Sequence, residues 1–226
     1  MHNFLLLMQL TDSNFPSGAF SHSFGMETFV QQEHIKNSTH FQSFLEGYIE
    51  QLCYADGLSA RLVYDYLTDG EWEKVLALDE VLYCSASASE SRLGAQRIGQ
   101  QMLRLYRALY RETLLDDYAT AIQQKKAYGH SSICQAILLF ELKFPKEIVV
   151  QTIMYTACST IIQNAVRAIP LGQTDGQKMF QLAVEKCTES ITKIMQLTEK
   201  HVGCTSPMLE IKQMQHEHIP VRLFMS

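Results

Sequence analysis

The chain has 226 residues, of which 46% are hydrophobic and 19% charged, and its formal net charge is -5. This composition is typical of a globular protein with one buried core, and it excludes a chain that is disordered throughout. No run of lysine or arginine is long enough to follow a phosphate backbone, so we do not expect nucleic acid as a partner.

The first ten residues contain a short apolar run, Phe4 to Met8, without a basic flank or a small-residue cleavage site. We therefore expect no signal peptide. No stretch reaches the roughly 18 apolar residues that a membrane span needs, so we expect no membrane association except through a partner.

The six cysteines are spaced too widely for a Cys-x-x-Cys metal clip. Four of them fall in apolar helical stretches, where a reduced thiol packs as a small hydrophobic side chain. These four are Cys53, Cys134, Cys158 and Cys187. We therefore expect free thiols and a cytoplasmic location.

Apolar residues recur at steps of three and four along most of the chain, which predicts helices. We expect them at residues 20–33, 40–67 with a possible break at Gly57, 71–85, 89–110, 113–126, 130–142, 146–168 and 175–199. Four capping-box patterns support helix starts: Thr39 with Gln42, Thr68 with Glu71, Ser87 with Glu90, and Thr174 with Gln177. Alternation with a period of two is scarce. The predicted fold class is all-α, a single-domain helical bundle of roughly eight to ten helices over residues 1–205, with a C-terminal tail over 206–226.

The segment from Asp12 to Gly25 is polar, with a turn expected at its proline and Ser21, His22 and Ser23 expected to open a helix. A histidine between two serines suggests a hydrolase. However, nothing in the sequence orients the imidazole and no G-x-S-x-G elbow follows a strand, so a helix-start cap is the favoured interpretation.

The predicted helix over 89–110 carries Gly94 and Gly99, which could be taken for a phosphate loop. No strand precedes them and no Gly-Lys-Ser/Thr follows, so close helix packing explains them better. We interpret Glu90, Arg92 and Arg97 on the same helix as salt-bridged surface or interface residues.

The predicted helix over 146–168 is apolar on nearly every face, so we expect it to be the central helix. A polar corner, PLGQTDGQ, follows it. Pro170 should end the helix, Gly172 should supply a positive φ, and Thr174 and Gln177 should cap the next helix.

The amphipathic period is lost after about residue 200, which predicts an extended or partly ordered tail. The tail contains His216 and His218, a weak chelate for nickel or zinc at best. A structural metal site usually needs about four ligands, so a surface role is favoured.

Three segments together resemble the UreF family of urease accessory proteins over nearly the whole chain. They are PSGAFSHSFGMETFV at 16–30, NAVRAIPLGQTDGQKMF at 164–180 and SPMLEIKQMQHEHIPVRLFMS at 206–226. Met26, Ala95 and Gln135 depart from the usual family pattern, and none of them lies in the corner or the tail.

The resemblance implies an all-helical adaptor without catalytic residues, cofactor or metal site of its own. It implies a homodimer, binding to the accessory protein UreD (called UreH in some organisms), binding through it to apo-urease, and recruitment of the nickel-carrying GTPase UreG. The candidate partner-binding residues are Ser21, His22, Ser23, Glu27, Arg167, Pro170, Gly172, Gln173, Thr174, Asp175, Gln177, Ser206, Pro207, Leu209, Glu210, Ile211, His216, Arg222, Leu223 and Phe224.

Within that set, we expect the tail to become ordered on UreD/UreH. Leu209, Ile211, Leu223 and Phe224 would be its apolar anchors and Arg222 a charged clamp.

Two other functions remain open from the residues alone. A helical enzyme could bring His22, Glu27 and Asp175 together in a pocket, and a nickel store could use the tail histidines. The sequence contains no nucleophile with its base and no metal cage, so the adaptor is the favoured hypothesis.

Overall fold

The computed structural model describes residues 2–204 and 206–226, and it leaves the side chains of His2 and Asn3 undescribed. In this described part of the chain the secondary structure is entirely helical, with no strand, so the predicted all-α bundle is confirmed. The α-helices are α1 (His2–Thr11), α2 (Met26–Gln31), α3 (Ser38–Leu52), α4 (Leu58–Thr68), α5 (Trp72–Ser85), α6 (Ser89–Leu109), α7 (Thr113–Gln123), α8 (Ser131–Glu141), α9 (Lys146–Ala168), α10 (Gln173–Gln196) and α11 (Pro207–His216).

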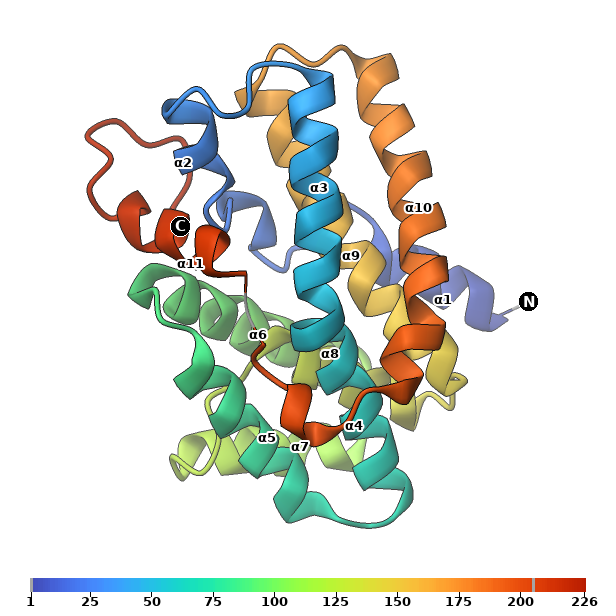
Figure 1. Ribbon diagram of the computed structural model, residues 1–226. Helices are drawn as coiled ribbons and strands as arrows, with labels where there is room; N and C mark the ends of the chain where they lie inside the picture. Colours follow the sequence, from blue (N-terminus) through green and yellow to red (C-terminus); the bar gives the residue numbers. More distant parts are fainter. Residues whose placement is uncertain (1, 205) are drawn as a thin grey trace.

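Helix α9 lies at the centre of the bundle, as its apolar faces predicted. It packs along α10 and contacts α1, α2, α3, α4 and α8, so most of its circumference is covered (Figure 1). Its buried side chains run from Val149 to Ala165. Helix α8 is also buried along most of its length, and α6, α4 and α7 pack around it.

A short π-helix, Cys53–Gly57, joins α3 to α4. The break expected at Gly57 therefore exists as a local widening of a continuous helical rod. A Cβ added at Gly57 would lie 2.9 Å from Ile194 Cδ1 and 3.1 Å from Met154 Sδ. A glycine here lets α9 and α10 approach the rod closely.

The four predicted capping boxes are wrong. Helix α3 is capped by Asn37, whose side chain accepts from the His40 amide, while α5, α6 and α10 have no side-chain cap. The hydroxyls have other partners: Thr68 Oγ1 donates to the Tyr64 carbonyl at 2.8 Å and Ser87 Oγ to Glu210 at 2.8 Å. Local main-chain and tertiary acceptors outcompete the capping role.

The corner between α9 and α10 also differs from the prediction. Helix α10 begins at Gln173, so Thr174 and Gln177 lie inside its first turns and do not cap it. Gly172 has φ -67°, an ordinary value, and the turn closes without a left-handed residue.

The helix expected over 20–33 is divided into a 3-10 turn, Ala19–Ser21, and α2. Phe24 and Gly25 between them have positive φ, 48° and 90°, which breaks the helical path. His22 and Ser23 therefore do not open a helix. They lie in the irregular stretch between the two elements.

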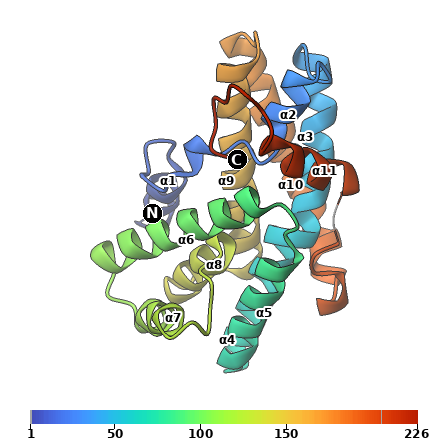
Figure 2. The same ribbon diagram turned by 90° about the vertical axis from the view of Figure 1, so that its left-hand side faces the viewer.

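Both ends of the chain contain helices that the sequence pattern did not predict. Helix α1 packs on α9 and buries Leu10. Helix α11 has proline at its first position, where the missing amide costs nothing, and it lies between α2 and α6 (Figures 1 and 2). The prediction of an extended tail is thus wrong over Pro207–His216.

The four cysteines expected inside the bundle are buried, whereas Cys84 and Cys204 are exposed, and all six are free thiols. Cys158 Sγ and Cys187 Sγ lie 3.8 Å apart across the α9–α10 contact. Among the described helices, none combines the length and hydropathy needed to span a bilayer.

Candidate functional site

The last residues of the chain lie against the polar segment near its start. The amides of Ser23 and Phe24 donate to the Ser226 main-chain oxygen at 2.6 and 3.0 Å, and the Met225 amide donates to the Ser21 carbonyl at 2.8 Å. Ser23 Oγ donates to the same Ser226 oxygen at 2.7 Å. The two segments that carry much of the family resemblance are therefore in direct contact.

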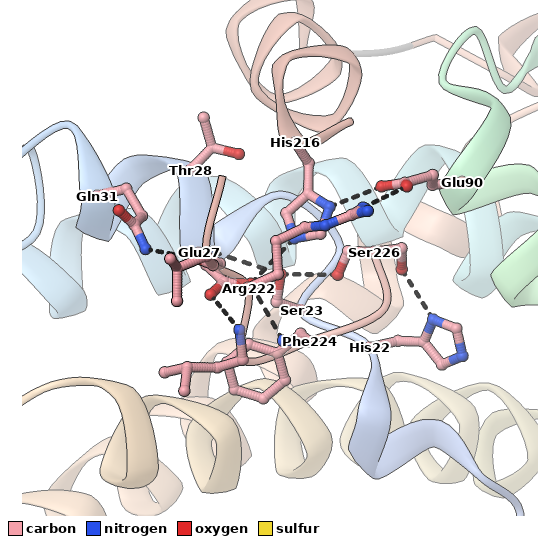
Figure 3. Close-up of polar contacts among 12 residues, drawn as sticks. His22, Ser23, Glu27, Thr28, Gln31, Glu90, His216, Arg222, Phe224 and Ser226 are labelled. Atoms are coloured by element: carbon pink, nitrogen blue, oxygen red, sulfur yellow. Dashed lines mark hydrogen bonds and ion pairs between the residues drawn. The ribbon is translucent and has the colours of Figure 1, made fainter. Parts of the chain in front are cut away.

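We name this region the C-terminal junction. It consists of His22, Ser23, Glu27, Glu90, His216, Arg222, Phe224 and Ser226 (Figure 3).

Glu27 is the acceptor at its centre. This carboxylate, 2% exposed, lies in the first turn of α2. It accepts from the amides of Leu223 at 2.6 Å and Phe224 at 3.2 Å, and its Oε2 lies 3.0 Å from His216 Nε2 (Figure 3). Because a buried carboxylate is costly without partners, these three contacts explain how α2 holds the tail in place.

The His216 ring bridges two carboxylates. Its Nδ1 lies 2.7 Å from Glu90 Oε2, on the side of the ring opposite Glu27, and the ring is fully buried. Arg222 Nη1 donates to the other oxygen of Glu90 at 2.5 Å. Burial alone would raise the pKa of Glu90, but the hydrogen bonds from His216 and Arg222 outweigh it and lower that pKa.

His22 forms the inner wall of the junction. Its Nδ1 lies 2.8 Å from Ser226 Oγ, and its carbonyl accepts from Asn164 Nδ2 of α9 at 2.8 Å. Burial lowers the pKa of His22, and the positive charges of Arg97 and His216 lower it further. Its role is to hold the chain end, which replaces the helix-start cap expected from the sequence.

Two glycines make room for this arrangement. A Cβ on Gly94 of α6 would lie 2.8 Å from His22 Nδ1, and one on Gly25 would lie 2.8 Å from Gln213 Cγ of α11. The interpretation of Gly94 as a close-packing residue is thus confirmed, with the junction as the neighbour.

Arg167, near the end of α9, connects the junction to the outer surface. Its guanidinium lies 4.0 Å from the centre of the Phe20 ring and 5.5 Å from that of Phe224. It also donates to the Phe20 carbonyl at 3.3 Å. Arg167 therefore stacks on aromatic rings from both ends of the chain.

The remaining corner residues do not reach the junction. The exposed ones are Pro170, Gly172, Gln173, Thr174 and Gln177. Asp175 is half-buried and pairs with Lys178 at 3.0 Å. The corner lies at the same end of the bundle as the loop joining α2 to α3 (Figure 1). Its side chains form a separate polar surface.

The tail residues divide between two faces. Leu209 and Phe224 are buried against the chain's own body, whereas Ile211 and Leu223 are 43% and 65% exposed. Only two of the four predicted anchors therefore face outward. Arg222 pairs with Glu90 of this chain, and its role as a charged clamp on UreD/UreH stays a prediction.

The start of α11 is held by polar contacts. The Ser206 amide donates to the Gln51 side chain, and Glu210 accepts from Ser87. Pro207, next to it, is exposed.

Two residues of the junction, Glu90 and Ser226, were not on the predicted list, and neither was Asn164 of α9, which donates to the His22 carbonyl. Asn164 did carry a signal, because a polar side chain within a helix that is buried on all sides needs a partner. Glu90 carried none, since its pattern is also typical of a solvated helix face.

A cavity of about 590 Å³ lies beside the junction, between the loop after α1 and the inner ends of α3, α6 and α8. Two polar groups lining it, Gln135 Nε2 and Ser91 Oγ, have no hydrogen-bond partner within the described residues, which suits water in the cavity. His22, Glu27 and Asp175 do not line it. The structure thus gives no support to the enzyme hypothesis, which required these three in one pocket.

The tail histidines do not form a chelate. His216 is buried with both ring nitrogens against carboxylates, whereas His218 is exposed. Throughout residues 2–204 and 206–226, no three histidine, cysteine or acidic side chains are grouped so that they could hold a metal ion.

The comparisons with known proteins agree with one another on the family. A family model described as UreF matches residues 35–183. Over 227 residues the chain is 43% identical to the urease accessory protein UreF of Bacillus sp. strain TB-90, with 100% of both chains covered. It is 40% identical over 228 residues to the protein of the same name from Lachnoclostridium phytofermentans, again with 100% of both covered.

Proposed function

Because the chain belongs to the UreF family of urease accessory proteins, we propose that it joins UreD/UreH to the GTPase UreG during nickel insertion into apo-urease. Membership makes it a non-catalytic accessory protein of urease maturation. The proposed scaffold role requires surfaces that bind partner proteins, and two surfaces of this chain support the proposal.

The first surface is the outer face of the docked tail. Met208, Ile211, Met214 and Leu223 are 56%, 43%, 41% and 65% exposed. The three on α11 are spaced by three residues and lie on one side of the helix. Exposed apolar side chains of this kind favour a protein partner, and thioethers adapt to its shape. We assign this face to UreD/UreH.

The observation that carries this assignment is that the inner side of the tail is bound to the body of the chain while its outer side is exposed. Glu27 and His216 fix its inner side, so the outer side is presented as a preformed surface. A preformed surface loses less conformational entropy on binding than a tail that must fold at the same time. The earlier hypothesis of partner-induced ordering is therefore replaced by docking on an ordered tail.

The second surface is the polar corner, with Gln173 and Asp175 on its rim. We assign the corner to the assembly that recruits UreG and reaches apo-urease. A homodimer and a cytoplasmic location complete this proposal.

The experiment is co-purification with UreD/UreH. The double variant Ile211→Asp/Leu223→Asp should lose capture, because it places charge at the centre of an apolar contact. Its matched control is Val81→Asp/Val184→Asp, at positions 46% and 52% exposed on α5 and α10. Both variants should keep the thermal unfolding midpoint of the parent chain.

Full capture by the tail variant would refute the assignment of this face. Full capture by a chain truncated before Ser206 would refute any role of the tail. In cells lacking the chain, urease should stay inactive until the chain is returned.

A further inference from the structure

The cavity beside the C-terminal junction has the size and the lining of a small-molecule site. Its volume is about 590 Å³, and pockets for small molecules typically measure roughly 300–1,000 Å³. Much of its wall is made of buried apolar side chains: Leu52, Leu82, Ile98, Met102 and Ile153. An apolar wall with a few polar groups placed on it is typical of sites that bind organic molecules.

The fully charged side chains around this cavity are all negative. Asp12, Asp56 and Glu210 line it, whereas no lysine or arginine of the described residues does. Asp12 is exposed, and Glu210 already accepts from Ser87. Asp56 is half-buried, and no lysine or arginine is among the groups that act on its carboxyl. The charge of the cavity therefore favours a cationic occupant and opposes an anion.

The π-helix Cys53–Gly57 brings Asp56 to the cavity wall. Asp56 and its neighbour Ala55 both line the cavity. Turns of this kind occur frequently at functional sites. Burial raises the pKa of Asp56, because His130, its own amide and the Ser132 hydroxyl offset the loss of hydration only in part. A cation beside the carboxyl would supply the missing stabilisation of its ionised form.

Two further polar groups on the wall lack a partner. Gln135 Nε2 and Ser91 Oγ form no hydrogen bond with the described residues, although both residues are more than nine-tenths buried. Such groups are costly unless water or a ligand satisfies them. The rings of Phe15 and Tyr48 also line the cavity, and aromatic faces attract organic cations.

We propose that this cavity binds a small organic cation, an ammonium group joined to an apolar body. The ammonium group pairs with Asp56, and the apolar body packs on Ile98 and Met102. A metal ion fits the wall less well, since no three histidine, cysteine or acidic side chains within residues 2–204 and 206–226 are grouped to hold one. The inference goes beyond the proposed function, because it concerns the isolated chain and needs neither partner surface.

The test is calorimetric titration of the full-length chain at pH 7 with three probes that share one aromatic ring. They are benzylamine, which is a cation, benzyl alcohol, which is neutral, and benzoate, which is an anion. Benzylamine should bind roughly tenfold or more tightly than benzyl alcohol, because its contact with Asp56 joins two charged groups. Benzoate should not bind.

Asp56→Asn keeps the shape of the side chain and removes its charge. This variant should lower the affinity for benzylamine to that for benzyl alcohol. Its matched control is Asp117→Asn, at an exposed position on α7 that does not line the cavity. The control should bind all three probes as the parent chain does.

Equal affinities of the parent chain for benzylamine and benzyl alcohol would overturn the proposal, as would the absence of binding by both. Nickel chloride that displaces benzylamine would also overturn it and would assign the cavity to a metal ion. If Asp56→Asn fails to fold, the parent chain decides. Nuclear Overhauser effects should connect the benzylamine ring to the methyl groups of Ile98 and Met102, and bound benzylamine without these contacts would refute the site.

Discussion

Replacing Glu27 with glutamine tests whether this carboxylate holds the tail. The substitution keeps the shape of the side chain but puts an NH2 group where one oxygen now accepts. One buried donor among the Leu223 amide, the Phe224 amide and the His216 ring is then left facing another donor. An unsatisfied buried donor costs about 1–3 kcal/mol, and the lost bond to a charged group adds a comparable amount.

Allowing for relaxation of the tail, we expect docking to weaken by about 2–4 kcal/mol, which is roughly 30- to 1000-fold in the docking equilibrium. Hydrogen exchange of the Leu223 and Phe224 amides measures this change directly. The matched control is Glu33→Gln, an exposed residue that, among the residues the structure describes, forms an ion pair with Lys36 alone. Unchanged protection of the two amides in Glu27→Gln would refute the role of Glu27 as the central acceptor.

Three further predictions concern the same fold. Gly94→Ala should destabilise the chain by about 1–3 kcal/mol in urea unfolding, because its Cβ would meet His22. Gly47→Ala, with open space around the added Cβ, should stabilise the chain slightly. Equal effects of the two substitutions would contradict the packing argument. The pKa of Glu90 is lowered in the folded chain, so its carboxylate contributes to the free energy of unfolding above the pKa of the unfolded state, and this contribution is lost as the pH falls through the folded-state pKa. The free energy of unfolding, measured from pH 6 to pH 3, should therefore fall less in Glu90→Gln than in the parent chain. Parallel curves for the two chains would count against this role of Glu90. Gln173→Ala/Asp175→Ala should leave the unfolding midpoint unchanged and reduce urease activation in cells, and normal activation would remove the corner from the proposed interface.

The helices of the body could be predicted because each one is encoded locally. Helix α9 was expected at residues 146–168 and occupies Lys146–Ala168, since its apolar residues recur with the helical period and Pro145 precedes it. The capping boxes failed because a hydroxyl has several acceptors within reach, and sequence spacing does not choose among them. Helix α11 was missed because its buried side includes Lys212 and His216, which a hydrophobic pattern counts as polar.

The junction could be predicted only in part. The resemblance drew attention to Glu27, His216 and Arg222, but no local pattern indicates that residues 189 positions apart share a hydrogen bond. Such pairing depends on the path of the whole chain. Polar residues at buried positions, such as Asn164, are the one signal that the sequence alone offers.

The π-helix between α3 and α4 determines how far α4 is rotated about its axis relative to α3. It places one extra residue in a turn, so the buried side of α3 faces α10 while that of α4 faces α8. Deleting a single residue from Cys53–Gly57 would restore regular winding and rotate α4 by about 100°. Leu58 and Leu62 would then turn away from their present contacts, so deleting a residue from this turn should cost more stability than substituting its half-buried residues Tyr54 or Ala55.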